Sequence, residues 1–325
     1  MKKITVIGGG TGAYVVLSGL KDEKVDLGAI VNMTDSGGST GRLRDQLGVL
    51  PPGDLRQCLV ALSDAPDLWR RLFLYRFNSG DFAGHNFGNI FLSALEKVST
   101  DYNEVVHTAS YVLKTKGDVI PVTIKKTHLC VKYQNGKILK GEGKIDDNTD
   151  ENSRIIKAYL DPEIEPNSFA IKRLKESDFI IISPGDLFTS IIPILLVKKI
   201  AKTICQSNAK IIYIMNLMTK KGQTTNYKVS DHINELNSYL GKDPDWVFIN
   251  NGLIPENITE WYLEHSEGPV VNDLNKKNTF KIIQADLVDR TTVIQNKADK
   301  LTRSILRHNS FSLARVMMKV IQNNI

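Results

Sequence analysis

Cysteine is scarce in this chain, and its few cysteines stand far apart. The 325 residues include only three, Cys58, Cys130 and Cys205. Their spacing matches neither a metal-binding motif nor a disulfide framework, which is typical of proteins from a reducing compartment. We therefore expect a cytoplasmic protein without disulfides.

The chain also lacks a long uninterrupted apolar run. The apolar stretch near the N-terminus ends in glycines at Gly8, too early for a signal peptide or a membrane span. The apolar stretch Ile191–Ile204 is interrupted by Pro193 and three lysines. It predicts an amphipathic helix, and we expect no membrane insertion.

The charged residues form no long tract of one sign. The net charge is +6, but the lysines are spread along the chain without a basic cluster interleaved with aromatics. This pattern indicates a lysine-rich background composition, and we expect no nucleic-acid partner. Hydrophobic residues (42%) and charged residues (24%) occur at levels ordinary for a globular protein.

Strand-like and helix-like segments alternate along most of the chain. Short β-branched or apolar runs predict strands, and amphipathic segments between them predict helices. The predicted strands are Ile4–Ile7, Leu27–Asn32, Phe179–Ile182, Lys210–Met215, Trp246–Asn250 and Phe280–Ala285. This alternation favours an α/β fold, with a mainly parallel sheet that helices cover on both faces.

One segment departs from this alternation. Val119–Ile145 alternates apolar and polar residues around Asn135-Gly136, a strong signal for a hairpin turn. We expect an antiparallel β insertion over residues 118–150, remote from any ligand, within a single domain of residues 1–325.

The most informative stretch is the block from Asp35 to Asp64. It combines glycines, hydroxyls, acids and three arginines, Arg42, Arg44 and Arg56. Glycines let backbone N–H groups approach an anion, and arginines bind phosphate through a planar fork of donors. The block therefore predicts one wall of a site for a phosphorylated ligand.

A glycine turn precedes this block. Residues Gly8–Ala13 read G-G-G-T-G-A between a predicted strand and a predicted helix, the context of a dinucleotide fingerprint. The acid expected about 20 residues later is not well placed, because Asp26 lies at the wrong end of its strand. The turn predicts a phosphate or nucleotide site. A further possible function, that of an NAD-dependent oxidoreductase, has this turn as its sole support.

Other polar loops follow predicted strands. S-P-G-D-L-F-T-S at Ser183–Ser190 opens a helix, and in a doubly wound sheet it faces the same edge as the glycine turn. G-H-N-F-G-N at Gly84–Asn89 and N-L-M-T at Asn216–Thr219 add polar side chains. For the Ser183–Ser190 loop alone, helix capping is an equally good explanation, but its convergence with the glycine turn and Asp35–Gly41 favours a ligand site.

Together these motifs resemble the YvcK-like gluconeogenesis factor family, a branch of the CofD-like (2-phospho-L-lactate transferase) superfamily. The resemblance runs from Ile4 to about Leu313. It implies a Rossmann-like three-layer α/β/α fold and a cytoplasmic protein that binds a UDP-sugar such as UDP-N-acetylglucosamine. It also implies a role in cell shape, cell-wall synthesis and growth on gluconeogenic carbon sources.

The resemblance leaves two functions open. The first is a UDP-sugar-binding regulator that needs no cofactor. The alternative is a metal-dependent transferase acting on a nucleotide-linked, phospholactyl-type donor, in which Asp35 and Asp54 would hold Mg²⁺. Either could act as a homo-oligomer. Where relatives carry R-H-D-P, this chain has Arg307-His308-Asn309-Ser310, which removes the acid.

We therefore predict a nucleotide and phosphate site assembled from loops at one edge of the sheet. Two of its members come from the C-terminal third, where Tyr262 would stack on the base and Arg307 would bind phosphate. The predicted residues are Gly8, Gly9, Gly10, Thr11, Gly12, Asp35, Ser36, Gly37, Gly38, Ser39, Thr40, Arg42, Asn86, Asn89, Pro184, Gly185, Asp186, Thr189, Ser190, Asn216, Tyr262 and Arg307.

Overall fold

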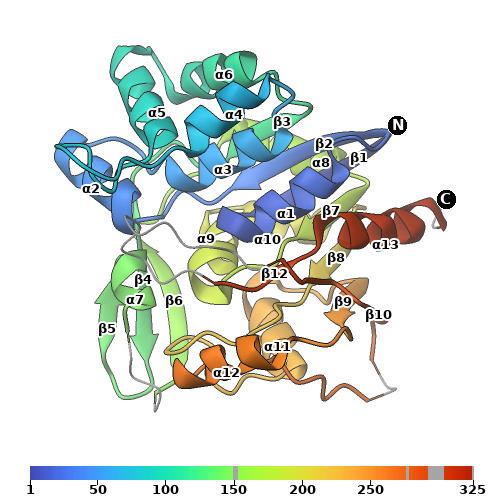
Figure 1. The fold of residues 1–325 in the computed structure, drawn as a ribbon. Coiled ribbons are helices and arrows are strands. Elements are labelled where there is room, and N and C mark those ends of the chain that lie inside the picture. Colours follow the sequence, from blue (N-terminus) through green and yellow to red (C-terminus); the bar gives the residue numbers. More distant parts are fainter. Residues whose placement is uncertain (149–152, 276–277, 292–303, 324–325) are drawn as a thin grey trace.

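The computed structural model describes residues 1–148, 153–275, 278–291 and 304–323. Its centre is a seven-stranded parallel sheet (Figure 1). The order across the sheet is β10 (Lys281–Ala285), β9 (Trp246–Asn250), β8 (Lys210–Ile214), β7 (Phe179–Ile182), β1 (Lys2–Gly8), β2 (Val25–Val31) and β3 (Asp118–Pro121). Strands β1, β7 and β8 are almost entirely buried, as continuous apolar runs in a parallel sheet require.

Helices cover both faces of this sheet (Figure 1). One layer comprises α1 (Gly10–Leu20), α3 (Gly53–Leu62), α6 (Tyr102–Leu113) and α13 (Ser310–Asn323). The other comprises α8 (Ser168–Glu176), α9 (Ile192–Leu196), α10 (Ile200–Gln206) and α11 (Val229–Leu240). This arrangement confirms the predicted three-layer α/β/α fold.

The remaining elements lie around the carboxyl edge or outside the two layers. They are α2 (Gly38–Leu47), α4 (Asp67–Leu74), α5 (Phe87–Val98), α7 (Glu142–Asp146), the π-helical turn η1 (Leu187–Ile191), α12 (Glu256–Glu264) and the short antiparallel pair β11 (Val288–Asp289) and β12 (Arg307–His308). None of the helices in the described ranges combines the length and apolar composition that a bilayer span requires.

The antiparallel insertion exists, but its predicted bounds of 118–150 are wrong at both ends. Its sheet consists of β4 (His128–Tyr133), β5 (Ile138–Lys140) and β6 (Ile155–Asp161), with the turn at Asn135-Gly136. Residues 118–121 instead form β3, which pairs in parallel with β2. Alternation of apolar and polar residues does not specify the direction of the neighbouring strand, so the sequence could not separate them. The single domain over residues 1–325 stays a prediction.

The helix expected over Ile191–Ile204 is also divided. The structure has α9 and α10 there, joined through Lys199, whose φ of 67° is left-handed. Helix α9 ends because its C-cap Val197 is extended, and the left-handed Lys199 is the N-cap of α10. Pro193 fits because it lies in the first turn of α9. The apolar periodicity continues across the break because both short helices pack on the same core.

Candidate functional site

The strand order places a crevice between β1 and β7. From β1 the chain passes to β2 on one side of the sheet, while β7 leads to β8 on the other. Ligands of doubly wound sheets bind at such a reversal, beyond the carboxyl ends of the strands. The loops after β1 and β7 approach so closely that a Cβ at Gly12 would lie 1.6 Å from the Pro184 carbonyl oxygen. Only glycine fits at that position.

A cavity of about 600 Å³ opens at this crevice. Its size is in the range of small-molecule sites. Most of the predicted residues line it, together with Asp54, which was expected only for a transferase. Those predicted residues are Gly9, Gly10, Thr11, Gly12, Asp35, Gly37, Ser39, Thr40, Asn89, Pro184, Gly185, Asp186, Ser190, Asn216, Tyr262 and Arg307.

Two helices begin at this cavity. The N-caps of α1 and α2 are Gly9 and Gly37, and neither helix has a side-chain cap or an acid in its first turn. A helix start of this kind presents free backbone N–H groups and the positive end of the helix dipole. The loops after the adjacent strands β1 and β2 thus place two helix starts of this kind in one cavity.

Carboxylates lie against these helix starts. A Cβ at Gly9 would be 2.1 Å from Asp54 Oδ2, and a Cβ at Gly53 would be 2.5 Å from Asp35 Oδ2. The two acids therefore occupy the same end of the cavity, in contact with the backbone. Glycine at these two positions makes that close approach feasible.

Helix α7 brings two further acids that the sequence analysis missed. Glu142 and Asp146 both line the cavity, and they are one helical turn apart. Burial raises the pKa of Glu142 well above its ordinary value, and the negative charge of Asp35 raises it further. Burial also raises the pKa of Asp146 to about 7, with Asp186 adding to the effect. The two carboxyl groups of α7 therefore keep their protons to a higher pH than an exposed carboxyl group does.

Hydrogen bonds attach α7 to both halves of the sheet. Glu142 accepts the Ser36 N–H at 2.9 Å, and Ser36 Oγ accepts the Gly143 N–H at 3.1 Å. Asp146 Oδ1 accepts from Gln223 Nε2 at 2.6 Å and from Thr189 Oγ1 at 3.2 Å. The expectation that the insertion is remote from the ligand site is therefore wrong.

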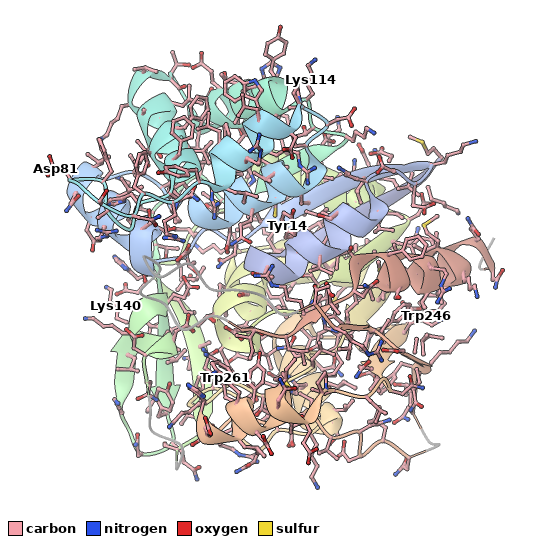
Figure 2. All side chains as sticks on the ribbon, in the orientation of Figure 1. Tyr14, Asp81, Lys114, Lys140, Trp246 and Trp261 are labelled. Atoms are coloured by element: carbon pink, nitrogen blue, oxygen red, sulfur yellow. The ribbon has the colours of Figure 1, made fainter. Side chains whose placement is uncertain are left out.

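The opposite side of the cavity carries cations and aromatic rings. Lys220 Nζ lies 3.2 Å from Glu267 Oε1, and nearby carboxylates raise the pKa of Lys220 to about 12 in spite of its burial. On α12, Trp261 stacks on His265 with ring centroids 4.1 Å apart. Figure 2 shows Trp261 on α12, in the lower part of the view near the small antiparallel sheet.

Tyr262 lines this side but is held by protein contacts. It is 1% exposed, and its hydroxyl pairs with Ser304 Oγ at 2.7 Å while accepting the N–H groups of Ile305 and Leu306. A ring packed in that way has no free face for a base. Its neighbour Trp261 lines the same side and is partly exposed.

Arg307 reaches the cavity from β12, although it is far along the chain from the glycine turn. The short pair of β11 and β12 places it there, beside His308, whose imidazole hydrogen-bonds the Met215 carbonyl. The C-terminal third of the chain therefore does reach the carboxyl edge, as the sequence analysis required.

Six predicted residues do not line the cavity, and five of them support its walls. Arg42 donates to the Ala83 carbonyl, Asn86 caps α5, and Ser36 and Thr189 hold α7. Gly8 packs against Ser183, where a Cβ would clash with the hydroxyl. The sixth, Gly38, lies in the first turn of α2. Loop residues can be assigned to a site from sequence, but the direction of each side chain depends on packing.

Several lining residues escaped the sequence analysis. Arg56 had been noted within its block but not assigned to the site, and Lys220 directly follows a motif that had been assigned. Others lie inside motifs that the sequence analysis quoted without assigning these members to the site, namely Gly53, Gln57, Leu217, Met218, Thr219 and His308. The remaining lining residues come from segments that carried no motif: Val15, Arg76, Asp147, Asn148, Lys221, Trp261, Glu264, His265, Glu267, Ser304 and Leu306.

The chain matches a known family over most of its length. The family model described as 2-phospho-L-lactate transferase CofD matches residues 4–288. The matched range includes the glycine turn, the Asp35 block and α7, and so most of the residues that line the cavity.

Individual relatives match over nearly the whole chain. The chain is 37% identical to the gluconeogenesis factor of Bacillus subtilis and 38% identical to a putative gluconeogenesis factor of Aquifex aeolicus. These matches cover 98% and 100% of this chain, and 98% and 99% of the relatives. A solved structure of a UPF0052 family member from Bacillus halodurans superposes with a TM-score of 0.88, at 33% identity, over 98% of this chain and 100% of that one.

Proposed function

The chain belongs to the CofD family and is similar to its gluconeogenesis factors, and from this premise we propose that its cavity binds a UDP-sugar such as UDP-N-acetylglucosamine. The protein would act as a cytoplasmic regulator, needed for cell shape, cell-wall synthesis and growth on gluconeogenic carbon sources. This proposal goes beyond the relatives' names, which mention gluconeogenesis alone.

The observation that carries the proposal is the pairing of two uncapped helix starts with carboxylates in one cavity. Helices α1 and α2 offer backbone N–H groups to a diphosphate. Asp35, Asp54 and Asp146 offer acceptors to the hydroxyls of a sugar or ribose. Trp261 offers a ring face for a base on the opposite side.

One observation favours the transferase alternative. Asp35 and Asp54 lie at the same end of the cavity, beside the helix starts where phosphates would bind. Mg²⁺ is commonly held by one or two carboxylates together with phosphate oxygens and water. No group of three or more metal-ligating side chains occurs among the described residues. The carboxylates therefore fit an ion that arrives with its nucleotide.

Calorimetry distinguishes the two functions. UDP-N-acetylglucosamine, a GDP-linked compound and NAD are titrated into the protein, each with and without Mg²⁺. A regulator should bind the UDP-sugar in the absence of metal, whereas a transferase should bind a nucleotide-linked donor only with Mg²⁺ and should consume it. Preference for GDP-linked compounds, or binding of NAD alone, would contradict the proposal.

Variants then locate the ligand. Trp261→Ala should weaken the UDP-sugar about 5-fold to 150-fold, since stacking of a base on an aromatic ring contributes about 1–3 kcal/mol. Trp69→Ala is the matched control, because Trp69 is partly exposed and lies outside this cavity. Asp54→Asn should remove any Mg²⁺ dependence, with Asp45→Asn on the exposed side of α2 as its control.

A further inference from the structure

The small antiparallel sheet of β4, β5 and β6 has two unlike faces. Its inner face packs on the core through Leu129, Val131 and Leu160, which are buried. Successive side chains of a strand point to opposite faces, so the intervening residues of each strand form an outer face. That face carries Lys132, Ile138, Lys140, Lys157, Tyr159 and Asp161. All six are at least partly exposed, so none of the described helices covers this side of the sheet.

Strand β5 is the open edge of this small sheet. The strand order is β5-β4-β6, and Figure 1 shows β5 on the outer side of the sheet, away from the main sheet. Ile138 is 56% exposed, and the side chain of Lys140 is 50% exposed. The opposite edge is closed, because the Ala158 N–H of β6 donates to Tyr239 Oη of α11 at 2.8 Å. Only β5 is therefore accessible to a further strand among the described parts of this sheet.

The backbone of β5 directs unused hydrogen-bonding groups away from the sheet. Directly after the strand, the Gly141 N–H donates to the Leu129 carbonyl of β4 at 2.8 Å. Backbone groups of successive strand residues point to alternate sides, so Leu139 also pairs with β4. The N–H and C=O groups of Ile138 and Lys140 therefore point outward. They form no hydrogen bond with any residue in the described ranges.

The unpaired charges on the outer face are positive. Lys132 and Lys157 lie directly opposite each other in the register of β4 and β6, and neither forms an ion pair with any residue that the structure describes. Asp161 is already paired with Lys140 at 2.6 Å. Like charges directly opposite each other destabilise a sheet, and an anion bound beside them would relieve the repulsion.

These features favour one kind of partner. A second copy of this chain, paired edge to edge through β5, would bring two sets of lysines onto one face, and lysines near an edge strand oppose such pairing. A nucleic acid would contact the lysines but would leave the main chain of β5 unpaired. An extended acidic peptide segment matches both the open backbone and the positive face.

We propose that β5 binds an extended, acidic segment of a partner protein as a fourth strand of the small sheet. Main-chain hydrogen bonds to Ile138 and Lys140 would fix its direction and register. Its carboxylates would project onto the outer face, where Lys140 lies on the neighbouring strand and Lys132 on the next, about 4.8 Å further on. Figure 2 shows Lys140 at the outer margin of the small sheet. Because neither lysine lines the cavity, this surface does not depend on the proposed UDP-sugar site.

A labelled peptide tests β5 directly. The probe is a short peptide in which glutamate alternates with valine, and fluorescence anisotropy follows its binding to the full chain. It should bind saturably, and UDP-N-acetylglucosamine should not displace it. A version with lysine in place of glutamate should bind at least about tenfold more weakly, because like charges then meet. A version with every backbone amide N-methylated should lose a similar factor of about ten, because it cannot donate to β5.

Substitutions in the small sheet supply matched pairs. Ile138→Pro removes an N–H that points away from β4, a setting in which an edge strand tolerates proline. It should weaken the peptide about fivefold to tenfold, whereas Ile138→Ala, which keeps the N–H, should stay within about twofold of wild type. Lys132→Glu should weaken the peptide about tenfold, since it reverses a charge on the outer face. Lys175→Glu on α8 is exposed and outside the small sheet, and it should leave binding unchanged.

Any of four results would overturn the proposal. The first is the absence of saturable binding by the acidic peptide. The second is equal binding of the lysine peptide, or binding that Ile138→Pro does not weaken. The third is displacement of the peptide by an equal concentration of single-stranded DNA, because the lysines would then serve a nucleic acid. The fourth is a dimer, detected by sedimentation, that Ile138→Pro dissociates, because β5 would then pair with a second copy.

Discussion

Replacement of Asp146 by asparagine should stabilise the protein, and more so at alkaline than at acidic pH. Asp146 lies at the end of α7, and its Oδ1 accepts hydrogen bonds from Gln223 and Thr189. An asparagine keeps that acceptor and resembles the protonated acid in shape. The substitution therefore removes the ionisation of Asp146 while it preserves the contacts of α7.

The magnitude follows from the pKa of Asp146, which is about 7 in the folded protein against 3.8 ordinarily. Since the pKa of Asp146 is higher in the folded protein, the folded protein binds this proton more tightly than the unfolded chain does. The difference applies at pH values between the two pKa values. Stability therefore falls as the pH rises through this window and is level above about pH 7. At about 1.36 kcal/mol for each pH unit, the full loss is about 4 kcal/mol. Because Asp146 faces a cavity open to water, this value is an upper bound.

Chemical unfolding at pH 5 and pH 8 measures the effect. The advantage of Asp146→Asn over wild type should grow by up to about 3 kcal/mol between the two pH values, since about two units of the window lie above pH 5. Asp147→Asn is the control, because Asp147 is the exposed neighbour on the same turn. An equal advantage at both pH values, or the same pH dependence in the control, would refute the reasoning.

Two further substitutions test the core. Arg173→Met should cost about 1–3 kcal/mol of unfolding free energy, because it removes the buried guanidinium that donates to the Ile4 and Asp26 carbonyls at 3.0 and 2.6 Å. The exposed neighbour Lys172→Met should change stability by less than about 0.5 kcal/mol, and a similar loss there would contradict the assignment. Tyr213→Phe should leave stability unchanged or raise it by about 1 kcal/mol, because the fully buried Tyr213 hydroxyl has no hydrogen-bond partner among the described residues. Differential scanning calorimetry that showed a clear loss would indicate a bound water at that hydroxyl.

The family and the fold class were accessible from the sequence because they depend on local patterns. The glycine turn at Gly8–Gly12 and the apolar run Phe179–Ile182 indicate which segments are parallel strands and where each ends. In a doubly wound sheet, loops at the carboxyl ends of neighbouring strands must meet. For this reason the contributions of Asp35, Gly185 and Asn216 to one cavity could be predicted without coordinates.

The tertiary structure alone decided what lies opposite those loops. Helix α7 carries Glu142 and Asp146 into the cavity from the antiparallel insertion, and no sequence motif marks that contact. Tyr262 turned out to be packed and Trp261 partly exposed, since the orientation of α12 on its small apolar cluster determines which ring faces the cavity. Local sequence patterns specify where strands and helix starts occur. The direction of a side chain and the approach of a distant segment are instead set by packing among residues far apart in the chain.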